Sequence, residues 1–153
     1  MFGSSNPLTV SNFIKNISDN LYENTKFYKI IEYPNTKIIH GGRFNNNKFS
    51  LDNKTIKTIP LEIQLINKQE PIYNREISDP LEFKFLKNSL QKGSISMVKI
   101  SKTESSSTEF FISTQKSAVL EGRYSVFGKV INGFEILENL ESKDYILEIE
   151  LNN

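Results

Sequence analysis

The chain of 153 residues contains no cysteine and no tryptophan, and its single histidine is His40. The absence of cysteine excludes disulfide bonds, thiolate nucleophiles and zinc sites built on cysteine. With one imidazole in the whole chain, a metal ion held by the protein is not expected, and no cofactor is implied. A chain without disulfides is typical of a reducing compartment, so the cytoplasm is the default expectation.

The sequence also lacks an excess of one charge and a long apolar run. Nineteen Lys and Arg residues stand against eighteen Asp and Glu residues, which gives a formal net charge of +1. That balance creates no field to attract nucleic acid or an anionic membrane, and neither partner is expected. No segment approaches the roughly 18 apolar residues that a membrane helix needs, and the first ten residues do not resemble a leader peptide. The sequence therefore predicts a soluble protein.

Length and hydrophobic content fit one folded domain over residues 1–153, with 37% hydrophobic residues available for its core. Asn6 and Pro7 form a helix start, and the apolar residues after them predict an amphipathic helix of about three turns. Strands are expected at 26–31, 37–40, 59–66, 93–100, 109–114, 126–131 and 145–151, and a second helix at 133–140. The pattern is mainly β, with a barrel or sandwich covered by two helices.

Three segments between these elements are expected to be irregular. Residues 44–54 are polar and rich in asparagine, which is typical of a surface loop. The polar run 101–108 is expected to be a loop only. Residues 67–92 are charged and interrupted by Pro71 and Pro80, and they are expected to form a long solvated connection inserted in the domain.

Six segments carry motifs that occur in a defined order. They are PLTVSNFIKN (7–16), KFYKII (26–31), IIHGGRF (38–44), GSISMVK (93–99), STEFFIST (107–114) and LEGRYSVFGKVINGFEIL (120–137). In this order they resemble the cyclophilin family of peptidyl-prolyl isomerases. They are similar to the family's first helix and to its FHR, QGGDF, GTLSMAN, SQFFI and LDG-to-VFG blocks. The resemblance implies an eight-stranded antiparallel barrel with two covering helices. It also implies a groove on the outer face that binds proline-containing peptides and isomerises their X-Pro bonds.

The start of the chain departs from the family. Phe2 matches the end of the family's second strand, so the first two strands have no counterpart. Either the first Met lies inside the domain, or this barrel is open. An open barrel would leave rows of unpaired backbone groups at its edges. Phe2 is therefore expected where a strand ends, leading through Asn6 into the first helix.

Isomerisation needs only easier rotation about an amide whose uncatalysed barrier is ~18–20 kcal/mol. A cation that donates to the prolyl nitrogen, and donors that hold the neighbouring carbonyl, would lower that barrier. By resemblance, Lys29 takes the place of the family arginine, and His40 takes that of the glutamine before Gly-Gly. Tyr124 stands where relatives carry His or Tyr, so its hydroxyl would hold a substrate carbonyl. Lysine keeps the charge of arginine but loses its planar fork of donors, so reduced activity is expected.

The same match assigns seven residues to the substrate groove. They are Ile38, Val98, Lys99, Glu109, Phe111, Val119 and Leu120. Phe111 and Leu120 keep the family's apolar character, whereas Lys99 replaces an Asn and Glu109 replaces a Gln. A pairing of Glu109 with Lys29 or Lys99 is expected. Val119 replaces the Trp of members that bind cyclosporin, so weak binding of that drug is expected.

Two functions remain open on the sequence. One is a monomeric isomerase of low activity, which the retained Phe111, Leu120 and Tyr124 favour. The other is a binding or scaffold domain of the same fold that holds proline peptides or a partner protein without useful catalysis. The altered positions favour this second function: Lys29, His40, Lys99 and Glu109. Each residue also has an ordinary alternative role, as a surface lysine, a structural histidine or part of the core.

Overall fold

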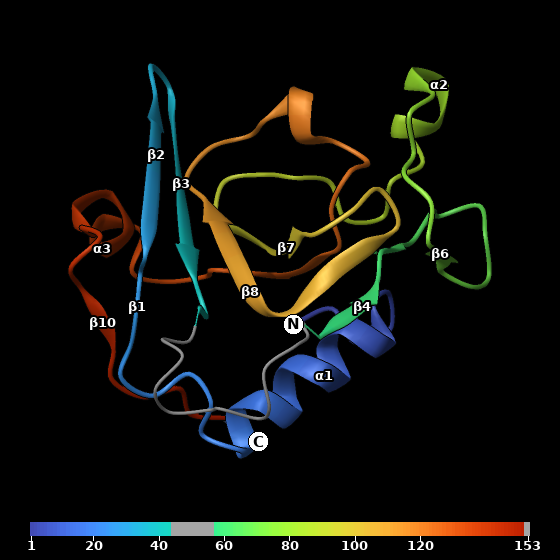
Figure 1. The fold of residues 1–153 in the computed structure, drawn as a ribbon. Coiled ribbons are helices and arrows are strands. Elements are labelled where there is room, and N and C mark those ends of the chain that lie inside the picture. The colour runs from blue at the N-terminus through green and yellow to red at the C-terminus, as the bar shows by residue number, and fades with distance from the viewer. Residues whose placement is uncertain (44–56, 152–153) are drawn as a thin grey trace.

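The computed structural model describes residues 1–43 and 57–151 (Figure 1). The predicted loop at 44–54 lies outside these residues. The helices are α1 (Pro7–Ser18), α2 (Pro80–Phe83) and α3 (Phe134–Asn139), with a 3₁₀ turn η1 (Ala118–Leu120). The strands are β1 (Thr25–Lys26), β2 (Lys29–Tyr33), β3 (Thr36–Gly41), β4 (Thr58–Pro60), β5 (Glu62–Ile63), β6 (Ile72–Tyr73), β7 (Ser94–Lys99), β8 (Glu104–Ser113), β9 (Val126–Lys129) and β10 (Tyr145–Ile146).

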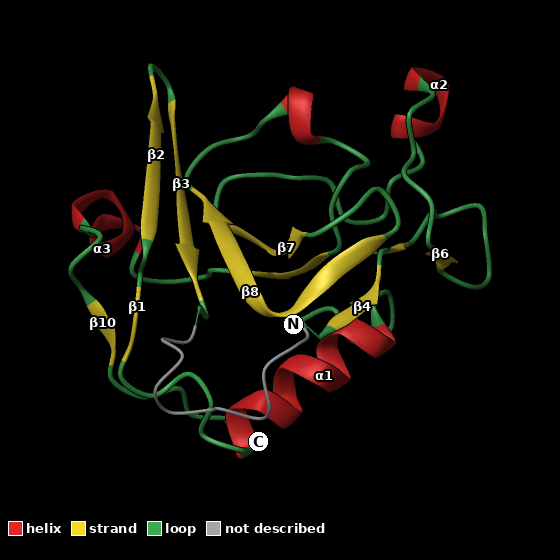
Figure 2. Ribbon diagram, in the orientation of Figure 1, coloured by secondary structure: helices red, strands yellow, loops and turns green. Residues whose placement is uncertain are grey.

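A curved antiparallel sheet organises the molecule (Figure 2). Its strand order is β2-β3-β8-β7-β9, and β4 pairs with the first part of β8. In the described part of the chain this sheet ends at β2 and β9 and does not close, which fits the open form of the predicted barrel. Phe2 runs beside β9, where its N–H donates to the carbonyl of Phe127 at 2.7 Å, and the chain then enters α1 through Asn6.

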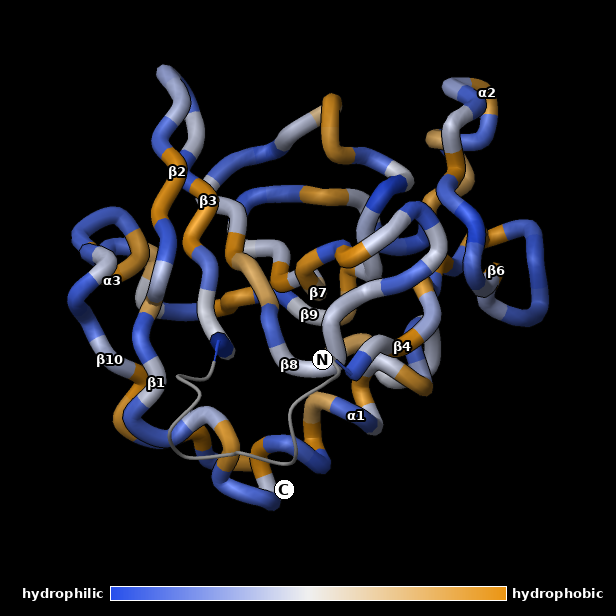
Figure 3. The backbone as a smooth tube through the Cα atoms, viewed as in Figure 1, coloured by the Kyte–Doolittle hydropathy of each residue, from blue (hydrophilic) through white to orange (hydrophobic). Residues whose placement is uncertain are grey.

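The two faces of the sheet bury two different apolar clusters, because side chains alternate along each strand. Along β3, Ile39 points inward while Ile38 and His40 point outward. The inner cluster lies between the sheet and the helices α1 and α3, and Figure 3 shows hydrophobic stretches along these strands and along α1. Its buried members are Val10, Phe13, Ile17, Tyr22, Ile39, Met97, Phe110, Ile112, Phe127, Leu137 and Ile146. The outer cluster belongs to the candidate site.

The helix α1 begins at the predicted Pro7, but a distant side chain caps it. The Asn6 side chain makes no capping bond, and its Nδ2 donates instead to the carbonyl of Glu62 at 2.9 Å. The Glu62 carboxylate accepts from the backbone N–H groups of Leu8 at 3.2 Å and Thr9 at 2.8 Å. Glu62 has no exposed surface. A buried negative charge therefore binds the positive end of the helix dipole.

The prediction that 101–108 is only a loop is wrong, because β8 begins at Glu104. Ser105 and Ser106 pair with β4, and both are buried. Serine is a poor strand former, but here the hydrogen bonds of nearby groups outweigh its propensity. The Ser106 hydroxyl accepts from the N–H of Glu109 at 2.9 Å, and the Ser107 carbonyl accepts from Asn16 of α1 at 2.7 Å.

Other boundaries also differ from the expectation. The predicted strand at 26–31 is divided into β1 and β2, the one at 59–66 into β4 and β5, and the one at 145–151 is reduced to β10. The segment 67–92 was expected to be solvated throughout, yet it contains β6 and α2. It also contributes to a third apolar cluster, here called the side cluster. The side cluster has Leu61, Ile63, Leu65 and Ile77 buried, with Ile72, Phe83, Phe85 and Leu86 packed against them.

Among the described residues, no helix is both long and apolar enough to cross a membrane.

Replacing Glu62 by Gln should lower the free energy of unfolding by about 1.5–3 kcal/mol, the range for buried hydrogen bonds to a charged group. The amide keeps the shape of the side chain but presents one oxygen where two helical N–H groups now find acceptors. Urea denaturation followed by circular dichroism measures the change. Glu23→Gln, at an exposed position, is the control and should change stability by less than about 0.5 kcal/mol. Equal stability of the two variants would contradict the capping role.

Candidate functional site

The candidate site is a row of residues across the outer face of the sheet. Lys29 of β2 lies directly opposite His40 of β3, and His40 lies opposite Phe111 of β8. Phe111 in turn lies opposite Ser96 of β7. Directly opposed residues of antiparallel strands project to the same face. The structure thus brings Lys29, His40 and Phe111 together, as the sequence predicted.

Aromatic rings continue this row on both sides of His40. The rings of Phe111 and Tyr124 meet edge to face with centroids 5.0 Å apart, and the His40 ring lies 5.9 Å from that of Phe111. On the other side, the Tyr28 ring lies 5.9 Å from His40. These four side chains, Tyr28, His40, Phe111 and Tyr124, form a continuous line of neighbouring rings that we call the ring row. Tyr124 therefore adjoins the predicted pocket, and Tyr28 is a member that sequence reasoning missed.

The outer cluster includes Phe111 and Tyr124 of the ring row and packs around them. Its buried members are Ile38, Leu90, Phe111 and Val126, and the partly buried Phe2, Ile31, Val98, Leu120 and Tyr124 pack against them. The predicted pocket residues Ile38, Val98, Phe111 and Leu120 are therefore in one cluster. Val119 is not among its members and is 73% exposed. Phe111 itself is only 2% exposed, so in this conformation its ring is covered by its neighbours.

The charged groups are arranged differently from the expectation. Glu109 does not pair with Lys29 or Lys99. Its carboxylate accepts from the Tyr28 hydroxyl at 2.6 Å and from Nε and Nη2 of Arg43 at 3.1 and 3.2 Å. The Arg43 guanidinium also stacks on the Tyr28 ring, 3.9 Å from its centroid. Planar arginine suits both contacts better than lysine, which explains why Glu109 binds Arg43.

Lys99 is also engaged away from Glu109. Its ammonium pairs with Glu76, and it lies 5.8 Å from the centroid of the Tyr124 ring. Lys29, in contrast, has no carboxylate within salt-bridge distance among the described residues, and its side chain is exposed. Of the cations at this face, Lys29 is thus the one left free of a described ion pair. Arg43 and Glu76 were missed because their partners are distant in sequence.

The loop that carries Leu120 and Tyr124 is held by the segment 67–92. Gly122 has φ +68°, and a Cβ there would lie 2.3 Å from the carbonyl oxygen of Ile77, so only glycine fits. The Ile77 N–H donates to the Gly122 carbonyl at 2.8 Å. Glu121 accepts from the Leu90 N–H at 3.2 Å, and burial raises the pKa of its carboxyl. The inserted segment therefore supports one wall of the site.

Comparison with known proteins identifies the family. The family model described as cyclophilin type peptidyl-prolyl cis-trans isomerase matches residues 1–150. The chain belongs to this family. It is 30% identical over 139 residues to peptidyl-prolyl cis-trans isomerase A of Dickeya dadantii, covering 88% of this chain and 60% of that protein. It is 26% identical over 145 residues to a peptidyl-prolyl cis-trans isomerase of Acinetobacter baylyi, covering 92% and 63%. The chain thus spans about three fifths of the length of these relatives.

Solved structures agree with the assignment. A cyclophilin type isomerase of Cryptosporidium parvum, crystallised in the presence of the dipeptide Ala-Pro, superposes with a TM-score of 0.59 at 26% identity. That match covers 95% of this chain and 82% of the other. A cyclophilin of Hirschia baltica, at 16% identity, gives a TM-score of 0.61 over 94% of this chain and 63% of the other. At this low identity, the match supports the fold and nothing more. The cyclophilin fold predicted from the motifs is confirmed.

The surroundings of His40 in the candidate site favour its neutral form. Its burial lowers the pKa of the imidazole below the ordinary 6.5, and the positive charge of Lys29 lowers this pKa further. A hydrogen bond with the Lys29 backbone and the Glu109 carboxylate oppose part of this lowering, but the net effect favours the uncharged ring, which carries one N–H. Tyr28 stays protonated as well, because burial raises the pKa of its hydroxyl and the nearby Glu109 carboxylate raises it further.

Replacing Lys29 by Ala should raise the pKa of His40 toward 6.5 but not fully, because burial, the larger cause, remains. The chain has one histidine, so its C2 proton gives a single resolved NMR titration curve. Lys102→Ala, in the exposed turn between β7 and β8, is the control and should leave the curve unchanged. An unchanged pKa in Lys29→Ala would show that the ammonium does not lie beside the imidazole in solution.

Proposed function

We propose that this domain is a slow peptidyl-prolyl cis-trans isomerase that acts on X-Pro bonds of peptides or proteins at the outer face of the sheet. The observation that carries the proposal is the row in which Lys29, His40 and Phe111 are direct cross-strand neighbours. It joins a free cation, a neutral donor and an apolar surface. These are the groups that a rotating prolyl amide requires.

Each group has a specific part in the proposed reaction. The prolyl ring rests on Phe111 and its neighbours Ile38, Val98 and Leu120. The Lys29 ammonium donates to the prolyl nitrogen, which becomes pyramidal as the amide loses conjugation. His40 and the Tyr124 hydroxyl hold the neighbouring carbonyl, and the backbone of Lys99 pairs with the peptide. No bond to the enzyme forms, so neither a nucleophile nor a cofactor is needed.

Two features support a low rate. Lysine is more strongly hydrated than arginine and donates from a rotating ammonium, so its alignment with the nitrogen is poorer. A loss of 100-fold corresponds to only ~2.7 kcal/mol of transition-state stabilisation. In addition, Phe111 is 2% exposed, so Tyr124 or Leu120 must move before a prolyl ring can reach it. Part of the binding energy is then used to open the site.

A second candidate function is a domain that binds proline peptides or a partner protein without useful catalysis. It is favoured by the altered residues Lys29, His40, Lys99 and Glu109. Under both functions the domain acts as a monomer in the cytoplasm, a compartment supported by the absence of cysteine. Cyclosporin binding is weak under both, because Val119 offers little apolar surface at the position where drug-binding relatives carry Trp.

Isomerase activity should be weak in the native chain and should rise about tenfold in Lys29→Arg. The guanidinium donates to the prolyl nitrogen through one N–H and keeps further donors for its own support. Rescue should be greater when His40→Gln is added, and because the two residues are neighbours their effects need not add. A protease-coupled assay on one X-Pro peptide gives kcat/KM for the native chain, Lys29→Arg, His40→Gln and the double variant.

Two controls define the result. Lys102→Arg introduces the same change far from the row and should leave kcat/KM unaltered. Lys29→Ala should abolish the remaining activity. Binding of the same peptide, followed by NMR shifts of Phe111 and Tyr124, separates the two functions. Binding without turnover in every variant supports the binding domain, whereas native rates at the family's usual level, or no response to Lys29→Arg, would refute the proposed role of Lys29.

A further inference from the structure

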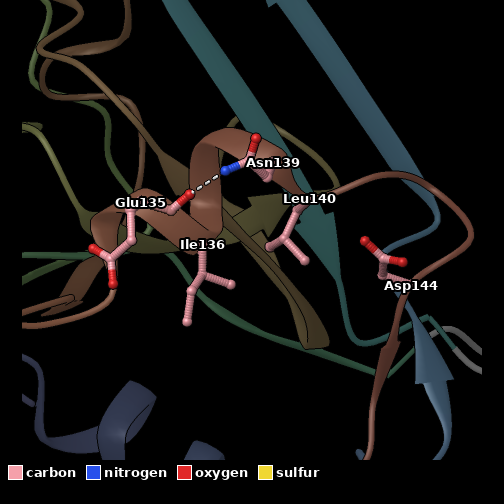
Figure 4. A pocket seen from close by; sticks show the side chains of 5 residues that line it. All are labelled: Glu135, Ile136, Asn139, Leu140 and Asp144. Atoms are coloured by element: carbon pink, nitrogen blue, oxygen red, sulfur yellow. Dashed lines mark hydrogen bonds between the residues drawn. The ribbon is translucent and has the colours of Figure 1, made fainter.

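A second surface feature lies on the opposite side of the sheet from the ring row. A cavity of about 350 Å³ opens beside α3 and is lined by Glu135, Ile136, Asn139, Leu140 and Asp144 (Figure 4). Leu137 and Leu140 pack with the inner cluster, which places α3 on that side of the sheet. The cavity is therefore separate from the outer cluster and takes no part in the proposed isomerase reaction.

The acidic groups of this region divide into two kinds. Glu138 pairs with Lys92 at 3.8 Å, and Glu141 pairs with Lys143 at 2.8 Å. Glu135 and Asp144, the two acids that line the cavity, form no salt bridge with any described residue. One Asp144 oxygen, Oδ2, accepts from the Glu141 N–H at 2.9 Å. The pKa of the Lys143 ammonium is raised by Glu141 and, to a lesser degree, by the nearby Asp144, but neither lining acid is held in a described salt bridge, so both carboxylates can still meet a partner.

Other polar groups near the cavity already have partners. Lys37 donates to the carbonyls of Glu138 and Leu140 at 2.9 and 2.8 Å, so the end of α3 is capped. Asn139 Nδ2 donates to the Glu135 carbonyl at 2.8 Å, as Figure 4 shows. Two donors of the described region, the Lys37 ammonium and the Asn139 amide, are thus already bonded, and with two carboxylates in its lining the cavity matches a positively charged ligand better than an anion.

The floor between the two acids is apolar. In Figure 4 the side chains of Ile136 and Leu140 lie between Glu135 and Asp144 and project to the same side. Ile136 is 61% exposed, an unusual position for isoleucine on a helix whose neighbouring Leu137 is buried. An exposed aliphatic group flanked by unpaired acids resembles half of an interface, with an apolar centre and a charged rim.

We propose that this cavity is a docking site for a basic segment of another protein, in which one aliphatic side chain lies between two Lys or Arg residues. The aliphatic side chain covers Ile136 and Leu140, and the two cations meet Glu135 and Asp144. The cavity is open rather than enclosed, which suits a chain segment better than a buried small molecule. Charge complementarity of this kind sets specificity and the rate of association more than affinity, so weak, salt-sensitive binding is expected.

An NMR titration of the ¹⁵N-labelled chain tests the proposal. The probe is a capped peptide with the order Gly-Lys-Leu-Lys-Gly, and two comparison peptides replace Leu by Ser or both Lys by Glu. The probe should saturate at millimolar concentration and shift the α3 amides and the Asn139 side chain. Raising NaCl from 20 to 300 mM shortens the Debye length and so screens the charges, and it should weaken binding at least fivefold. The Ser and Glu peptides should bind at least fivefold more weakly.

Variants of the chain locate the binding. Glu135→Lys, Asp144→Asn and Ile136→Ser should each weaken the probe at least threefold. The double change Glu148→Lys with Glu150→Lys reverses exposed charges outside the cavity and should leave binding within twofold. Unfolding temperatures confirm that each variant folds, and kcat/KM on an X-Pro peptide should be unaltered throughout. The proposal would be overturned if the control pair weakened the probe as much as the cavity variants do, or if the Glu peptide bound as tightly as the probe. It would also be overturned if the probe caused no saturable shift.

Discussion

The contact on which the rest of the structure depends is that between the Glu62 carboxylate and the first turn of α1. A fully buried charge is costly unless hydrogen bonds and an opposite charge compensate it, and here two helical N–H groups provide both. The same residue donates its N–H to the Ser125 hydroxyl at 2.8 Å and accepts at its carbonyl from Asn6. One residue thus fixes the helix to β5 and to the start of β9.

That connection reaches the candidate site through Ser125. Tyr124 and Val126, its neighbours in the chain, both belong to the outer cluster beneath the ring row. Asn88 adds a second link, because its Nδ2 donates to Asn6 Oδ1 at 3.0 Å and to the Val126 carbonyl at 3.3 Å. The wall of the groove and the entry of the helix therefore share one hydrogen-bond network. A change that loosens α1 is therefore expected to loosen the packing of Tyr124 as well, although α1 and Tyr124 lie on different parts of the fold.

How much of the fold and of the candidate site could be predicted depends on how far apart in sequence the interacting residues lie. The resemblance of the motifs assigned Lys29, His40 and Phe111 to one site, and the strand pairing makes them cross-strand neighbours. The serine stretch at the start of β8 was missed because its partners in α1 and β4 are remote in sequence. The side cluster was missed because five of its eight members lie in the segment 67–92, where the apolar positions follow no regular period. These members are Ile72, Ile77, Phe83, Phe85 and Leu86. Glu62 follows no motif at all.

The partner of Glu109 explains how an altered site keeps its free cation. A carboxylate near the ring row would attract the Lys29 ammonium and compete with a substrate for it. Arg43 and the Tyr28 hydroxyl instead hold that carboxylate with three hydrogen bonds. Exposed ion pairs add little stability, so the main effect of these hydrogen bonds is to hold the Glu109 carboxylate on Arg43 and not on Lys29. With Glu109 neutralised by Arg43, Lys29 stays available, and in the proposed reaction it can act beside a neutral His40.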